Sequence, residues 1–436
     1  INMFLAGKDL NVLGVSCSQG TLKADDCFQK VASLLNFYHH EGIPAGIGNN
    51  TESKLPPWNA FAASIQWGIA EGEIKKQDAD QLLEKVLSRS EENVTLVALG
   101  SLATYAQLIR NTKQNLTKIG QIVWYCEPDL EKEFNYLLDK NAYHEIIKSG
   151  IPLVIVSKGK RELHADENYS RYLQSSKVVY AKRIYKTLNE KHILEKTLQG
   201  HSQLWDDLVP LYLSHPDLFK TTKKDRFANA ILKQDVPDDA IYVDILQIFN
   251  SKIDAMNRVF ESFPIQPSIY KKDYAGIVQS TVDHYGLAEW KSIVLTNEVH
   301  GHTGIYSIIG AKAGIRACEY FNVGVNKLSA VSYAGSKPPL SCFNDGIQIS
   351  TGATIGQGLI KVADEVKPVP TIDFDYNGKK IRLILKKDVA ERMQSDIKAP
   401  IQRFGFSTEY WNTIENLAKV YWTDFNRHDI FDIITL

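Results

Sequence analysis

The chain has 436 residues, and at roughly 150 residues per domain this length predicts two or three domains. Apolar residues are 44% and charged residues 23%, which is globular composition and excludes a disordered chain, a collagen or a coiled-coil rod. The net charge of −1 offers no basic surface, so we expect no nucleic acid and no membrane as partners. Five scattered cysteines predict mostly free thiols.

Short β-branched runs alternate with amphipathic stretches over the first 160 residues. The runs predict buried strands at 11–15, 94–99, 121–125 and 152–156. The amphipathic stretches predict helices at 24–39, 78–87 and 102–109. This alternation predicts an α/β fold with a mostly parallel sheet flanked by helices. Further along the chain, the lysine-rich run Lys220–Lys224 is most simply a solvated loop.

The character of the sequence changes after two prolines in Ser262–Ser268. Because such a segment breaks helices, we predict a boundary there, with domains at 1–264 and 269–436. A hairpin is expected from Thr371–Tyr376 and Lys380–Leu385, with Asn377-Gly378 supplying the positive φ of the turn. The second domain is therefore predicted to be a smaller α+β domain.

Four stretches in the first part of the chain resemble motifs of the inosine–uridine nucleoside hydrolase family. They follow the family's order over roughly residues 1–260, at 10–20 with 42–46, 97–106, 133–142 with 149–153, and 204–219. The resemblance implies the family's α/β fold. It also implies ribose contacts from Glu133 and Asn135, a calcium ligand in Asp206 and a backbone ligand in the carbonyl of Leu99.

Calcium prefers six to eight oxygen ligands, so several carboxylates must converge around it. The family's Asp-x-Asp-x-x-x-Asp-Asp pattern does not occur in the sequence, which starts at Ile1, and we expect a catalytically incomplete half unless upstream residues complete it. Two alternatives stay open. This half is a non-catalytic binding or dimerisation module, or Asp206 and Asp207 are simply the acidic start of a helix.

The sharpest short motif in the second domain is Glu298-Val-His-Gly-His302. Strand side chains have period two, so His300 and His302 would point the same way if the segment were extended. On a helix they would lie about 200° apart around the axis. An extended His-x-His segment is a natural two-point grip for a metal ion, and Gly301 would let the backbone bend.

The residues that follow make this part of the chain similar to the FmdE domain of formylmethanofuran dehydrogenase. The matching pieces are a small-residue helix at Gly310–Cys318, then Cys342–Gln348 and Thr351–Leu359. Two family cysteines fall on Gly304 and Ala353. The resemblance leaves His300, His302 and Cys342 as ligands, with Glu298, Asp345, Thr351 and Thr354 beside them.

Two imidazoles and a thiolate suit zinc with one open position, and nickel or iron would also accept them. The alternative for Cys342 is a buried small hydrophobic residue. We therefore expect a metal-binding protein of uncertain activity with a small-molecule ligand, and a calcium-dependent nucleoside hydrolase is the competing function. We also expect a homo-oligomer. An exported bacterial protein, periplasmic or on the cell surface, is favoured because related fused proteins resemble exported ones.

Overall fold

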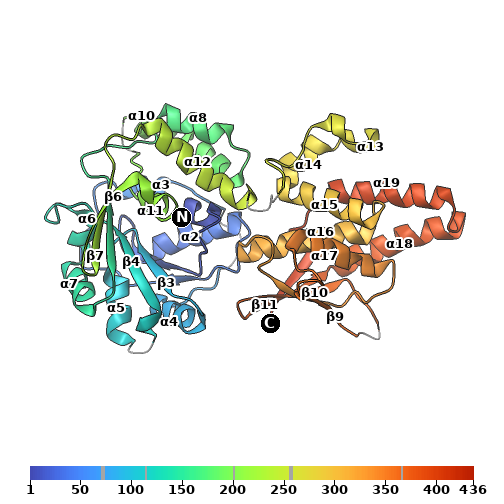
Figure 1. The fold of residues 1–436 in the computed structure, drawn as a ribbon, viewed down its shortest axis with the longest axis horizontal. Coiled ribbons are helices and arrows are strands. Elements are labelled where there is room, and N and C mark those ends of the chain that lie inside the picture. Colours follow the sequence, from blue (N-terminus) through green and yellow to red (C-terminus); the bar gives the residue numbers. More distant parts are fainter. Residues whose placement is uncertain (70–73, 113–114, 200–201, 255–258, 365–366) are drawn as a thin grey trace. The chain divides into compact units, whose positions relative to one another are not determined.

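The computed structural model describes residues 1–69, 74–112, 115–199, 202–254, 259–364 and 367–436. The chain forms two compact units, Ile1–Lys252 and Ile253–Leu436. Figure 1 shows that each unit combines a sheet with helices. Within the described ranges, no helix has both the length and the apolar character that crossing a membrane requires.

The N-terminal unit is built around a five-stranded sheet with the strand order β3-β4-β5-β7-β6. Its strands are β3 (Val94–Ala98), β4 (Ile119–Tyr125), β5 (Leu153–Ser157), β6 (Phe219–Lys224) and β7 (Phe227–Leu232). All neighbouring strands are parallel except β6 and β7. A second, parallel pair joins β1 (Val15–Cys17) to β2 (Ala45–Ile47). The predicted mostly parallel sheet is therefore confirmed.

Helices connect these strands, and some of them bury apolar side chains in one core cluster with the sheet. They are α1 (Asn2–Ala6), α2 (Ala24–Phe37), α3 (Asn59–Ser64), α4 (Ala79–Arg89), α5 (Ala103–Asn111), α6 (Phe134–Leu138), α7 (Lys140–Ser149), α8 (Glu167–Ser175), α9 (Val179–Leu188), α10 (Lys191–Leu198), α11 (Leu208–Ser214) and α12 (Asp238–Asp254). Local chemistry fixes their starts. Asp78, for example, accepts hydrogen bonds from the backbone amides of Asp80 and Gln81 and so caps α4.

The interpretation of Lys220–Lys224 as a loop is wrong. These residues belong to β6, which pairs with β7 at the edge of the sheet. All five side chains from Lys220 to Lys224 are exposed, and Phe219 is the buried member of the strand. Lysine is common on edge strands because its charge discourages pairing with another chain. The charge run therefore marks a sheet edge.

The C-terminal unit holds a second five-stranded sheet with the order β12-β11-β10-β8-β9. Its strands are β8 (Ser329–Ser332), β9 (Ile360–Val362), β10 (Thr371–Tyr376), β11 (Lys379–Leu385) and β12 (Phe431–Thr435). The predicted hairpin is confirmed, since β10 and β11 pair antiparallel and Asn377 and Gly378 both have positive φ. Buried and less buried residues alternate along β11, so one face of the sheet enters the core.

Helices of the C-terminal unit pack on that apolar face. They are α13 (Lys272–Ala275), α14 (Val278–Tyr285), α15 (Leu287–His300), α16 (Ile305–Phe321), α17 (Phe343–Thr351), α18 (Lys387–Phe404) and α19 (Thr408–Asp424). Helix α16 is buried nearly all round. It approaches α17 so closely that a Cβ on Gly310 would lie 2.0 Å from the carbonyl oxygen of Phe343. The small residues of the predicted helix are therefore the contact surface between two helices.

Candidate functional site

In the N-terminal unit, polar side chains gather where β4 and β5 end. Glu133 is 8% exposed, and its carboxylate accepts hydrogen bonds from the backbone amides of Glu127 (3.0 Å) and Asn135 (3.1 Å). The side-chain amide of Asn135 donates to the carbonyl oxygen of Tyr125 at 3.2 Å. Both residues that the resemblance assigns to ribose therefore lie at the carboxyl edge of the sheet, where open α/β sheets bind their ligands.

Two further residues complete this group and were missed from the sequence. The Tyr125 hydroxyl donates to Glu127 Oε1 at 2.8 Å, and the backbone amide of Lys158 donates to the same oxygen at 2.9 Å. Glu127 follows β4 and Lys158 follows β5. Their positions directly after two predicted parallel strands were the signal that could have identified them.

Asp206 precedes α11, and its side chain keeps solvent access although protein atoms crowd the carboxyl group. This desolvation raises its pKa to about 7, reinforced by the carboxylates of Asp207 and Glu133. Burial likewise raises the pKa of Glu133. Because the Glu133 carboxylate contributes to the raised pKa of Asp206, these two carboxyl groups lie near each other at the site.

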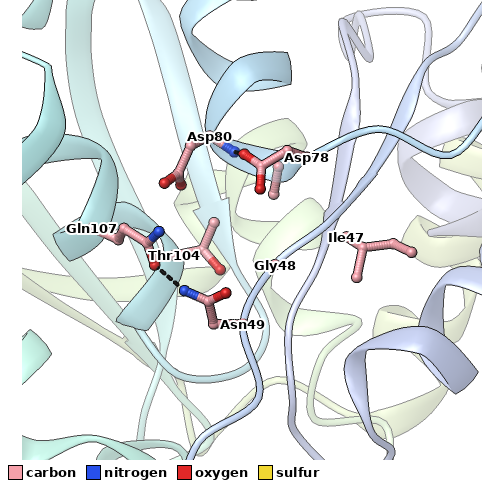
Figure 2. Close-up of a pocket in the computed structure, with 8 residues that line it drawn as sticks. Ile47, Gly48, Asn49, Asp78, Asp80, Thr104 and Gln107 are labelled. Atoms are coloured by element: carbon pink, nitrogen blue, oxygen red, sulfur yellow. Dashed lines mark hydrogen bonds between the residues drawn. The ribbon is translucent and has the colours of Figure 1, made fainter.

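Figure 2 shows a polar depression elsewhere in this unit, formed by the segment after β2 and by the first turns of α4 and α5. Its lining residues are Ile47, Gly48, Asn49, Asp78, Ala79, Asp80, Thr104 and Gln107. The Asn49 side-chain amide donates to Gln107 Oε1. The buried Thr104 hydroxyl has no hydrogen-bond partner within the described residues. None of the residues predicted for a functional site lines this depression.

In the C-terminal unit, the structure brings the two predicted histidines together, but not through an extended segment. His300 is the last residue of α15, and Gly301 ends the helix with φ +80°. This left-handed residue reverses the chain, so the rings of His300 and His302 lie 4.3 Å apart between centroids. The premise of a period-two strand was therefore wrong, and the glycine produces the proximity instead.

One nitrogen of His300 is anchored and the other is free of protein partners. Nδ1 lies 2.8 Å from Asp345 Oδ2, and because a carboxylate only accepts, Nδ1 carries the proton. Nε2 is buried and finds no hydrogen-bond partner in the part of the chain that the structure describes. Histidines that bind metal commonly donate their second nitrogen to a carboxylate in this way. The arrangement leaves Nε2 with a lone pair available to a ligand.

Because Gly304 has no side chain, the space beside His300 Nε2 is not filled. A Cβ at Gly304 would lie 3.0 Å from His300 Nε2 and 2.6 Å from Ser307 Oγ. Gly304 is also the position on which a family cysteine falls in the resemblance described above. The ring of His302 also meets the ring of Trp411 on α19 edge to face, with 5.6 Å between centroids. Burial and the neighbouring His300 lower the pKa of His302, so its imidazole favours the neutral form.

The remaining predicted residues occupy several environments. Cys342 is half-buried directly before α17, and burial followed by the Asp345 carboxylate raises the pKa of its thiol. Glu298 is exposed on α15. The buried Thr351 hydroxyl donates to the carbonyl oxygen of Ile347 at 2.6 Å. Thr354 Oγ1 accepts from a backbone amide three residues further on, in the same loop.

Among the described residues, no group of three or more His, Cys, Asp or Glu side chains is arranged to hold a metal ion. The predicted trio is thus not preassembled. The unpartnered Nε2 of His300, its carboxylate anchor and the adjacent His302 nevertheless fit a divalent metal of the zinc, nickel or iron type. Cys342 would have to move its thiolate toward the two rings to join them.

The C-terminal unit also holds a buried charge network on α15 and α16, and it was not predicted. Glu289 on α15 accepts from the Lys312 ammonium at 2.5 Å and from the Arg427 guanidinium at 2.9 Å. Arg427 and His428 also hold Glu319. Burial alone would raise the pKa of Glu319, but the Arg427 guanidinium and the hydrogen bond from His428 outweigh it and hold the pKa well below its usual range.

Family profiles match part of each unit. The profile of the inosine-uridine preferring nucleoside hydrolases matches residues 1–247, which is more than half of the chain. The chain therefore belongs to the nucleoside hydrolase family. The profile of FmdE, described as molybdenum formylmethanofuran dehydrogenase operon, matches residues 299–421. Both resemblances read from the sequence are confirmed.

Among similar proteins is the pyrimidine-specific ribonucleoside hydrolase RihA of Enterobacter sp. (strain 638), which is 25% identical over 241 residues, covering 50% of this chain and 76% of that protein. RihA of Escherichia coli O1:K1 is 24% identical over 248 residues, with 51% and 78% covered. Among solved structures, the purine-preferring ribonucleoside hydrolase of Gardnerella vaginalis has 14% identity and a TM-score of 0.46, with 57% and 93% covered.

Proposed function

We propose that the C-terminal unit binds one divalent transition-metal ion, zinc foremost, through His300 and His302, with Cys342 as the third ligand. The observation that carries this proposal is the buried, unpartnered Nε2 of His300, whose Nδ1 is fixed by Asp345. A lone pair buried without a partner is costly, and a metal ion would satisfy it. Zinc at such a site supplies a Lewis acid that lowers the pKa of bound water.

The residues of the chain have distinct roles in this proposal. Asp345 orients the His300 ring and increases its basicity, which makes it a positioning residue. Gly301 sets the distance between the two rings. Trp411 packs on His302 and limits solvent access from one side. The open position of a three-ligand site is where a small-molecule ligand would bind.

The test measures the metal content of the purified chain by mass spectrometry, before and after incubation with zinc and gel filtration. We expect about one metal ion per chain, lost in His302→Ala and bound about 10–100-fold more weakly in Asp345→Asn. His284→Ala is the matched control, because His284 is an exposed histidine of the same unit. A wild type that retains no metal, or a His302→Ala variant that retains it fully, refutes the proposal.

A second candidate function rests on the N-terminal unit, which we propose recognises the ribose of a nucleoside. The supporting observation is the cluster of Glu133, Asn135 and Asp206 at the carboxyl edge of the sheet. The family's reaction, cleavage of the N-glycosidic bond, needs calcium and several carboxylates. The proposal thus separates into binding alone and binding with hydrolysis.

Both forms are tested with uridine, cytidine and inosine in the presence of calcium. Release of free base, followed by chromatography and lost in Asp206→Asn, would establish the hydrolase. Binding detected by calorimetry without base release, and weakened in Asn135→Ala, would establish the binding module. If neither binding nor base release is detected, both forms are wrong. Asp217→Asn serves as the control, because Asp217 is an exposed acid outside the cluster.

A further inference from the structure

Two thiols of the N-terminal unit lie side by side. Cys17 is the last residue of β1 and is 1% exposed. Cys27 is in the second turn of α2 and is half-buried. Ala24, Phe28 and Val31 are the buried residues at helical spacing around it, so Cys27 lies beside the buried stripe of α2, a helix that packs against β1 and β2. The two thiols are joined by a side-chain hydrogen bond.

The surroundings make the two sulfurs chemically unequal. The hydrogen bond from Cys17 lowers the pKa of Cys27, and the Lys30 ammonium one turn further along α2 lowers it as well, while burial opposes both. The same hydrogen bond and burial raise the pKa of Cys17. Cys27 is the more exposed of the two thiols and has the Lys30 ammonium near it, which makes it the better placed nucleophile, whereas the buried Cys17 is a protected thiol.

We propose that Cys17 and Cys27 form a reversible disulfide, and that this pair is a redox modification site of the N-terminal unit. The Cys27 thiolate attacks hydrogen peroxide, which breaks the O–O bond and gives a sulfenic acid and, after protonation of the departing hydroxide, water. The Cys17 thiol then displaces the sulfenic hydroxyl, forming the S–S bond and releasing a second water. The peroxide takes up the two electrons that the thiols lose, and a dithiol reductant reverses the reaction.

The disulfide would tie the segment between the two cysteines to the fold. That segment already contacts its neighbours, since Gln19 donates to the carbonyl oxygen of Ser53 at 2.7 Å and accepts from the amide of Thr51 at 3.1 Å. Asn59 donates to the carbonyl oxygen of Thr21 at 2.7 Å. A covalent closure of this short loop should raise the unfolding temperature of the unit by roughly 5 °C.

The test treats the full chain with hydrogen peroxide, alkylates the remaining thiols and digests with trypsin without reduction. Cleavage after Lys8, Lys23 and Lys30 places Cys17 and Cys27 on separate peptides, which only a disulfide can join. We expect the joined pair, at the mass of both peptides less two hydrogen atoms, and its loss on treatment with dithiothreitol. Cys318→Ser is the matched control and should keep the linkage.

A second measurement identifies the nucleophile. In Cys17→Ser, peroxide should leave a sulfenic acid on Cys27 that dimedone traps, and in Cys27→Ser no trap should form on Cys17. If the two peptides of the wild type are recovered separately and fully alkylated, the proposal is wrong. It is also wrong if Cys27 is overoxidised without linkage, or if the linkage joins either residue to another cysteine.

Discussion

The substitution Gly346→Ala tests the contact between α16 and α17. A Cβ at this position would lie 2.0 Å from the carbonyl oxygen of Ser307 and 2.3 Å from the amide nitrogen of Ala311. Both atoms are backbone, so no rotamer change can relieve the clash. The two helices would have to separate by about 1 Å, which is the kind of overpacking that costs about 1–3 kcal/mol or more.

Alanine also stabilises the helix, because its helix propensity is about 1 kcal/mol more favourable than that of glycine. With a clash against backbone the cost should reach the upper end of its range, so the net loss of stability is about 2 kcal/mol. For a unit of this size that loss corresponds to an unfolding temperature lower by about 4–8 °C. Asp345 is the adjacent residue, so the hydrogen bond to His300 should lengthen and zinc binding should weaken.

Calorimetry of the full chain measures the first effect, and competition with a zinc chelator measures the second. The control is Gly324→Ala in the same unit, where a Cβ would meet nothing within 4 Å and φ is ordinary. We expect the control to match the wild type in both assays. An unfolding temperature of Gly346→Ala equal to or above that of the wild type would refute the close helix packing described here.

Three further outcomes follow from particular residues. Thr104→Val should raise the free energy of unfolding by about 1 kcal/mol in urea titrations, because it removes a buried hydroxyl that has no described partner; a loss of stability would reveal one. The low folded-state pKa of Glu319 beside Arg427 stabilises the fold above about pH 4.3, the unfolded value, and this contribution is lost as the pH falls toward the folded value. In Glu319→Gln the free energy of unfolding should fall less steeply as the pH is lowered into this acidic range. An unchanged pH dependence would contradict the assignment. Gly304→Cys should tighten zinc binding relative to Gly304→Ala, because the new side chain starts 3.0 Å from His300 Nε2; equal affinities would count against that geometry.

The sheet of the N-terminal unit could be predicted because its signals are local. A buried parallel strand such as β4 is a short β-branched run, and each run is bounded by polar residues or glycine. The hairpin of β10 and β11 could be predicted equally well, since Asn377-Gly378 specifies its turn. The strand β6 could not be predicted, because its exposed lysines have the pattern of a loop and only its pairing with β7 makes it a strand.

The sequence could predict which residues form the candidate metal site, but not how they are arranged in space. The short motif around Gly301 identified His300 and His302, but it could not show that the helix α15 continues to His300. Resemblance indicated Asp345, whereas its hydrogen bond to Nδ1 depends on how α17 packs against α15. The backbone amide of Glu127 donates to the Glu133 carboxylate in the segment after β4, which the position after a predicted strand could have indicated but a local motif could not.

The buried charges of the C-terminal unit bear on the same site. Glu289 lies near the start of α15, which ends at His300, and Lys312 lies in α16, which begins shortly after His302. Their ion pair therefore joins the two helices on either side of the histidines. A buried ion pair adds little net stability, because desolvation offsets its attraction, but breaking it is costly and its geometry is demanding. We therefore regard the network, with Arg427 across the pair, as fixing the register between α15 and α16.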